Sequence, residues 1–370
     1  MDGGSVDMTA AMIEQEELRD SIRQLLADEE WLLAAREDES VNQPRILRLW
    51  KEMAGLGWLG LSVGEDFGGL GLGLNELAVL YRECGRYLAP SPILPHMLAA
   101  QAIANAGTAE QKDSWLPRLA EGKVRASMKL PESGAPVAAL SAGRMLTGTT
   151  SHVLGSPDST HIFLPVRKPS KSLALTMLPV ETEGVTLKER PSADPSRHLF
   201  DVIVDKAEVV EDQILDLGDA QWRGLIDHAL IATACDSVGG AEHILEITVD
   251  YMGVREQFGR PIGSFQALKH RVASWKVLLE AASALVSEAV GHVAGGLPEG
   301  SAGASGSKFY ACDAYEQIAG DAVQLHGGMG FTWEHSCHRF LKRAKLNQFL
   351  FGSAKYHQDR AAGFLFGASE

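Results

Sequence analysis

The sequence predicts an α+β protein that is mainly α-helical, with three parts. These are an N-terminal helical domain, a small middle β-barrel or sandwich, and a C-terminal four-helix bundle. Apolar residues recur at helical spacing over the first part, extended β-rich runs bounded by Pro, Gly and Ser follow, and long helical patterns then return. A chain of 370 residues is long enough to bury cores of this size. The expected domains are residues 1–122, 123–215 and 216–370.

The first domain is expected to be built from helices around one glycine-rich loop. Residues 64–73 read GEDFGGLGLG, which is too rich in Gly for a helix. Pro44 is expected to start the second helix and Gly57 to end it. The helical patterns cover Ala10–Ala35, Arg45–Leu56, Leu74–Leu88, Leu94–Ala106 and Glu110–Ala120.

The pattern changes at Lys123 and changes back at Asp219. The β-rich runs are Arg125–Lys129, Thr160–Arg167, Ser172–Val180 and His198–Val210. The bundle helices are expected at Asp219–Met252, Ala267–Val293, Lys308–Leu325 and Glu334–Phe349. Residues 295–307, GGLPEGSAGASGS, are expected to form a flexible connection between the second and third of these helices.

Composition narrows the classes of partner. The formal net charge of −14 argues against nucleic acid and against an anionic membrane surface. No apolar run is long enough to span a bilayer, and the acidic N-terminal segment does not resemble a signal peptide. Four scattered cysteines without a C-x-x-C pair are typical of buried free thiols. We therefore expect a cytoplasmic protein without membrane insertion.

Two motifs in the last domain carry groups suited to a dinucleotide. Arg255 offers five donors in a rigid fork that matches a pyrophosphate, and Phe258 offers an aromatic face. Gln266 has an amide that can read the edge of a heterocycle. Gly327 and Gly328 let backbone approach a ligand more closely than a side chain would allow. A helix hairpin broken at Pro, together with a packing pair of glycines, is the alternative interpretation.

These motifs, R-x-x-F-G followed by F-Q and then Q-x-x-G-G-x-G, resemble those of the acyl-CoA dehydrogenase family. The resemblance covers nearly the whole chain. It implies the cofactor FAD, an acyl-CoA substrate that is desaturated between carbons 2 and 3, and an electron-transfer flavoprotein as acceptor. It also implies that the FAD-binding residues are Arg255, Gln257, Phe258, Phe265, Gln266, Gln324, Gly327 and Gly328.

The catalytic base of that family has no counterpart here. The reaction needs a carboxylate aimed at the substrate α-carbon. In many members it is the Glu of a Tyr-Glu-Gly-Thr turn, which matches residues 350–353 and places Phe351 at the base position. The second position used in the family falls at Ala229. Asp227 matches an acid that contacts the CoA portion, although a solvated Asp is the alternative.

The segment that would hold the flavin ring is also altered. Residues 129–136 keep Pro131 and Gly134 of the family's Thr-Glu-Pro-x-x-Gly-Ser-Asp-like turn but lose its Thr, Ser and Asp. Ser133 or Thr147 would be able to replace a lost hydroxyl, with ordinary turn residues as the alternative. In the family, one subunit holds the flavin ring and base, and its neighbour supplies the pyrophosphate and adenosine contacts. The chain keeps only the second set, which resembles the non-catalytic partner in heteromeric, sterol side-chain enzymes.

The first hypothesis is therefore a subunit of a heteromeric, FAD-dependent acyl-CoA dehydrogenase, in a heterotetramer with two copies of a homologous subunit that carries the base. The second is an autonomous dehydrogenase or related flavin oxidase with a relocated base such as Asp236, with Glu246 and Asp250 on the same helix. The alternative for these three acids is that they are ordinary solvated residues on an exposed helix face. The third is a flavin-free acyl-CoA-binding or scaffold protein.

Two weaker patterns concern charge and metal. A basic helix end is expected to be a solvated or inter-subunit face, with CoA phosphates as the alternative target. It consists of His338, Arg339, Lys342, Arg343 and Lys345. No metal site is expected, because the spacing of the histidines does not match metal-ligand patterns. Those histidines are His270, His326, His335 and His338.

Overall fold

The computed structural model describes residues 3–28, 39–90, 92–132, 137–333 and 335–367. The chain forms two compact units. One consists of residues 1–36, 74–89 and 230–370, and the other of residues 37–73 and 90–229. The mainly helical α+β class, with helical regions on either side of a small β region in the sequence, is confirmed. The division at residues 122 and 215 stays a prediction.

The helices of the second unit are α3 (Glu39–Gly55), α5 (Ile93–Ala106) and α6 (Ala109–Ala120), with short 3-10 turns at Trp58–Gly60 and Glu65–Phe67. Helix α3 contains Pro44 instead of starting after it, which corrects the expected start. Helix α6 begins with a capping box, in which Thr108 Oγ1 accepts from Gln111 N at 3.2 Å and Gln111 Oε1 accepts from Thr108 N at 3.0 Å. Gln111 Nε2 also donates to the carbonyl of Ile214 at 2.9 Å, which links α6 to strand β8 (Ile214–Leu215).

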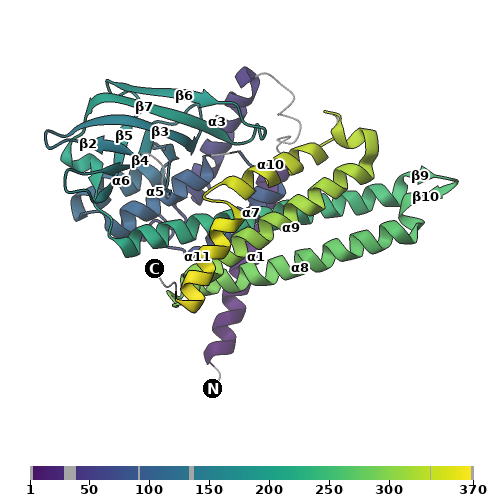
Figure 1. Ribbon diagram of the computed structural model, residues 1–370. Helices are drawn as coiled ribbons and strands as arrows, with labels where there is room; N and C mark the ends of the chain where they lie inside the picture. Colours follow the sequence, from purple (N-terminus) through teal and green to yellow (C-terminus); the bar gives the residue numbers. More distant parts are fainter. Residues whose placement is uncertain (1–2, 29–38, 91, 133–136, 334, 368–370) are drawn as a thin grey trace. The chain divides into compact units, whose positions relative to one another are not determined.

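The β region is one eight-stranded sheet in the order β6-β7-β3-β1-β4-β5-β8, with β2 beside β3 and β4 (Figure 1). Strand β1 runs parallel to β4, and β3 runs antiparallel to β7. Buried residues such as Ile162, Leu164 and Val202 form its core. The strands are β1 (Ala126–Met128), β2 (Ala138–Leu140), β3 (Met145–Gly155), β4 (His161–Arg167), β5 (Leu173–Pro179), β6 (Val185–Arg190), β7 (His198–Glu208) and β8 (Ile214–Leu215).

The first unit contains α1 (Gly3–Asp28), α4 (Leu74–Arg86), α8 (Gln266–Ala294), α9 (Gly300–His326), α10 (Cys337–Phe349) and α11 (Ala354–Phe366). Helix α7 (Asp219–Val254) begins in one unit and ends in the other. Specific polar contacts join these helices. Arg82 Nε donates to Glu242 Oε2 at 3.0 Å between α4 and α7, and Trp275 Nε1 donates to Asp321 Oδ2 at 3.0 Å between α8 and α9. The four expected bundle helices are thus present.

The flexible connection expected at residues 295–307 is wrong over its second half, because α9 begins at Gly300. The small residues there pack instead of flexing. A Cβ on Gly303 would lie 3.4 Å from that of Ala289, an ordinary packing distance, so this segment lies against α8. Ala302, Ala304 and Ser305 are buried in the same segment.

By length and composition alone, α8 is able to cross a membrane, which corrects the expectation that no apolar run is long enough. That expectation rested on uninterrupted apolar runs, whereas α8 reaches the length with Glu280 and Glu288 among its apolar residues. Core helices of soluble proteins pass the same test, so one such helix is weak evidence for a membrane span; 28% of its apolar window is buried.

Candidate FAD and acyl-CoA site

The first motif forms a small hairpin between α7 and α8. Strands β9 (Glu256–Gln257) and β10 (Arg260–Pro261) pair antiparallel, with Gln257 opposite Arg260. The two linking residues both have positive φ, 54° at Phe258 and 75° at Gly259, which two-residue hairpins favour. The expected break between two helices is confirmed, and the hairpin itself was not expected. A bulky residue with positive φ is uncommon and is often found at functional positions.

The side chains of this hairpin point to solvent. Phe258 is 91% exposed, and Arg255, Gln257 and Gln266 are exposed as well. The guanidinium of Arg255 makes no hydrogen bond or ion pair with any residue that the structure describes. Among the described aromatic rings, Phe258 packs against Phe265 in a T-shaped arrangement, with centroids 6.2 Å apart. A rigid set of five donors and an aromatic face are thus left open to an outside group.

The second motif ends α9 and continues as a 3-10 turn over Gly327–Phe331. Gly327 has φ +60°, which favours glycine. Gly328 has neither a positive φ nor any heavy atom within 4 Å of an added Cβ among the described residues. The packing of the described residues therefore gives no reason for glycine at 328, and its contact with a ligand stays a prediction. Gln324, one turn earlier, is exposed.

A ring stack joins the two motifs. Tyr251, on the last turn of α7, stacks on His326, the last residue of α9, with centroids 4.4 Å apart and planes 21° apart. Arg255 follows Tyr251 by four residues, and Gly327 follows His326 directly. The structure therefore brings the starting points of the two predicted motifs together, although the motifs are far apart in the sequence.

The expected base position is occupied by an aromatic ring that is only partly buried. Phe351 has φ +59° and lies between α10 and α11. The buried Lys308 donates from Nζ to the carbonyls of Gln348 at 2.9 Å and Gly352 at 2.6 Å. Burial lowers the pKa of Lys308. Neither the Phe351 ring nor the Lys308 ammonium can accept a proton from a substrate carbon.

The second base position is equally unable to act. Ala229 and Leu230 are fully buried on α7 and carry no acid. Asp227, two residues earlier, is only 5% exposed, so the alternative of a solvated Asp is wrong. Its contact with the CoA portion of a substrate stays a prediction.

The acids considered as relocated bases are held by cations or lie in solvent. Asp236 is buried, and its carboxylate accepts from Arg343 Nη1 at 2.8 Å and from Asn347 Nδ2 at 2.7 Å. Glu246 accepts from Arg86 Nη1 at 3.0 Å. Asp250 is exposed. A carboxylate fixed in a buried ion pair is a poor general base, which weighs against Asp236 in that role.

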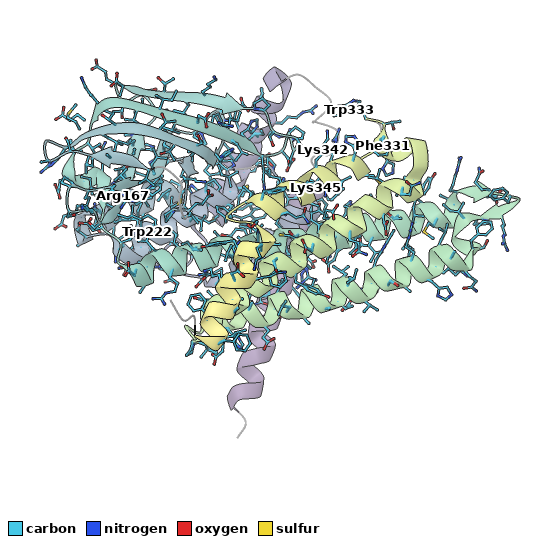
Figure 2. All side chains as sticks on the ribbon, viewed as in Figure 1. Arg167, Trp222, Phe331, Trp333, Lys342 and Lys345 are labelled. Carbon is cyan, nitrogen blue, oxygen red and sulfur yellow. The ribbon has the colours of Figure 1, made fainter. Side chains whose placement is uncertain are left out.

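The basic helix end expected to be solvated is mostly buried. His338, Arg339 and Arg343 are 7%, 3% and 1% exposed, because α10 turns this side toward the core. Only Lys342 and Lys345 reach the surface (Figure 2). Lys342 Nζ lies 4.9 Å from the ring centroid of Trp333, and Lys345 pairs with Glu316 at 2.7 Å. The expectation of a five-residue face is therefore wrong.

The turn that would face a flavin ring is described only in part. Lys129 stands where the family has Thr, is 8% exposed, and pairs with Glu132. Thr147 Oγ1 accepts from Lys206 N at 3.3 Å, as an ordinary strand residue does. Ser133, Gly134 and Pro136 lie outside the described residues.

Comparison with known proteins identifies the family. Residues 13–123 match the model for the acyl-CoA dehydrogenase N-terminal domain, and residues 218–365 match that for the C-terminal domain. Acyl-CoA dehydrogenase IpdE2 of Mycolicibacterium smegmatis is 31% identical over 357 residues, covering 95% of this chain and 99% of that protein.

Solved structures agree with this family assignment. The Tcur3481-Tcur3483 steroid ACAD G363A variant superposes with TM-score 0.84 at 30% identity, over 95% of this chain and 97% of that one. The ChsE4-ChsE5 complex from Mycobacterium tuberculosis gives TM-score 0.84 at 23% identity, over 96% and 98%. Solved structures with this fold include complexes with FAD and FADH2, and FAD is the family's cofactor. The chain belongs to the acyl-CoA dehydrogenase family.

Proposed function

We propose that this chain is a subunit of a heteromeric, FAD-dependent acyl-CoA dehydrogenase and supplies the pyrophosphate and adenosine half of a shared FAD site. A homologous subunit carries the base and the flavin-ring contacts. The complex desaturates an acyl-CoA between carbons 2 and 3 and passes electrons to an electron-transfer flavoprotein.

One asymmetry carries this proposal. The dinucleotide motif faces outward, with Arg255 unpaired among the described residues and open space beside Gly328. The base position instead carries Phe351, in a turn whose Gln348 and Gly352 carbonyls accept hydrogen bonds from Lys308. A chain with its own complete site would need both halves to be functional.

The chain's residues fit the dinucleotide part of FAD. The Arg255 fork matches two phosphate oxygens of a pyrophosphate and adds opposite charge. Phe258 offers a ring face, and Gly328 leaves room for backbone to approach the ligand. When bound, FAD accepts the hydride released in the desaturation. This chain's part is to hold and orient the dinucleotide, while the proton leaves to a base on the partner.

The comparisons suggest the class of partner and substrate. One similar structure is named as a steroid ACAD with a paired designation, and another as a complex of two named proteins. A heterotetramer acting on a steroid side-chain CoA ester is therefore the proposed assembly. Asp227 is proposed as a contact for the CoA portion.

A flavin-free acyl-CoA-binding protein is the second candidate. The Lys129–Glu132 pair and the Phe351 turn favour it, because both occupy positions where the family has groups that serve the flavin ring or the substrate. The two candidates differ in whether Arg255 and the glycine pair contact FAD in a complex.

The test places a carboxylate at residue 351, the position where many members of the family carry the base. In the assembled complex, Phe351→Glu should leave the dehydrogenation rate nearly unchanged, because no flavin ring is held there. Replacing the partner's base with Gln should lower the rate by about 10²–10⁴-fold, the usual contribution of a general base. Phe349→Glu, at a residue 72% exposed on α10, is the matched control for added charge.

Rates must be expressed per folded complex, with flavin measured on the same sample, because a charge added at a partly buried position costs stability. A large gain in rate from Phe351→Glu would show that this chain houses a working flavin site and would refute the proposal.

A further inference from the structure

Two imidazoles and one thiol converge in the segment that joins α9 to α10. His326 ends α9, Cys337 begins α10, and His335 lies between them. One ligand atom from each of the three residues lies within 4.8 Å of the other two. Their spacing, H-x8-H-x-C, does not follow common zinc patterns, so residue spacing alone does not reveal the cluster.

The protonation of His326 is set by its surroundings. Its Nδ1 lies 2.8 Å from the carbonyl of Ala322, so the neutral ring donates from this atom. Its Nε2 therefore carries the lone pair, and it is buried without a hydrogen-bond partner among the described residues. Metal-binding histidines typically have one nitrogen held by a backbone carbonyl and the other free for the ion.

The other two groups lie beside this ring. The Cys337 Sγ is fully buried and lies 3.3 Å from His326 Nδ1. The His335 ring centroid lies 4.4 Å from that of His326, and its Nδ1 accepts from the backbone N–H of Cys337 at 3.2 Å. His335 is only partly buried, which gives an ion a path from solvent.

We propose that His326, His335 and Cys337 bind one Zn²⁺, with water as the fourth ligand. Zn²⁺ takes imidazole and thiolate ligands in tetrahedral geometry, in which nitrogens lie about 3.4 Å apart and a nitrogen and a sulfur about 3.6 Å apart. The ligand atoms lie within 4.8 Å of one another, so no pair needs to close by more than about 1.4 Å to reach this geometry. As the zinc–sulfur bond forms, the Cys337 thiol releases its proton to solvent.

The ion would join the end of α9 to the start of α10 across residues 327–336, the loop that carries Gly327 and Gly328. Burial raises the pKa of Cys337 to about 12, so without metal the thiol is protonated and unreactive. The inference concerns a structural ion and does not rest on the proposed sharing of FAD.

Cobalt(II) is the probe, because a thiolate ligand gives it a near-ultraviolet charge-transfer band. The purified full chain, stripped with chelator, should bind one Co²⁺ with this band, and added Zn²⁺ should bleach it. Cys337→Ser should abolish the band, and His335→Ala should weaken binding at least ten-fold. Cys312→Ser, a buried thiol on α9, and His270→Ala, exposed on α8, are matched controls that should change neither.

X-ray absorption of the zinc-loaded wild-type chain tests the ligands without any variant, in case Cys337→Ser does not fold. One sulfur and two imidazoles in the first shell are expected. A band that is absent from the wild type or survives in Cys337→Ser would overturn the site, as would a first shell of oxygen and nitrogen alone.

Discussion

Removing the cation from the buried Asp236–Arg343 pair should strongly destabilise the first unit, which contains α10 and the part of α7 that carries Asp236. Arg343 is 1% exposed, and its two terminal nitrogens donate to Asp236 Oδ2 at 2.8 Å and to the carbonyl of Ala89 at 2.9 Å. Arg343→Met keeps much of the side-chain volume but leaves the Asp236 carboxylate in a buried site without its guanidinium. Breaking a buried pair in this way costs about 3–5 kcal/mol.

Thermal melting followed by near-ultraviolet circular dichroism measures the effect. For a unit of this size, 1 kcal/mol shifts Tm by about 2–4 °C, so Arg343→Met should lower Tm by roughly 6–20 °C. The double variant Asp236→Leu with Arg343→Met removes both charges and should recover most of the loss, because apolar pairs of similar volume replace buried ion pairs well.

Lys276→Met is the matched control, since the Lys276–Glu280 pair on α8 is 61% and 64% exposed. Such a pair should change stability by at most about 0.5 kcal/mol. A fall of less than about 2 °C for Arg343→Met, or a double variant no more stable than the single one, would refute the assignment of this pair as a buried structural contact. Asp236 would then return as a candidate base.

Two further predictions concern the ligand and pH. Arg255→Ala should weaken FAD binding in the complex about ten- to a hundred-fold, from the loss of about 1.5–3 kcal/mol, and Arg255→Lys should restore only part of the affinity because an ammonium lacks the guanidinium fork. Flavin fluorescence titration measures both affinities, and an unchanged affinity in both variants would mean that the motif is structural. Burial lowers the pKa of His96 to about 4, so its folded form resists protonation and stability is lost as pH falls below about 6.5. Between pH 7 and 5 this one residue should lower the free energy of unfolding by about 2 kcal/mol. Chemical denaturation of His96→Gln should show a loss of unfolding free energy over this pH range that is smaller by that amount, and an equal loss in the wild type and the variant would contradict the assignment.

Periodicity was sufficient to predict most helices, because their apolar faces repeat at helical spacing. It failed where small residues pack closely. The Gly and Ser of residues 300–307 have the composition of a linker but lie against α8. It also failed at β6, where exposed, charged residues at the edge of the sheet hide the alternation of a strand.

At the candidate site, chemistry could be predicted from residue type but geometry could not. The outward position of Arg255 and Phe258, and the empty space at Gly328, depend on a hairpin only two residues long on each side. The burial of Arg343 and the convergence of His326 with Cys337 depend on how α10 packs, and residue spacing alone does not reveal it.

The FAD content of the purified chain, alone and with its partner, tests the central claim most directly. If the chain supplies only the pyrophosphate and adenosine half, it should purify nearly free of flavin. Co-expression with a homologous subunit that carries the base should give a complex with about one FAD per two chains, as expected when the two kinds of subunit share each site. Stoichiometric FAD in the isolated chain would contradict the account.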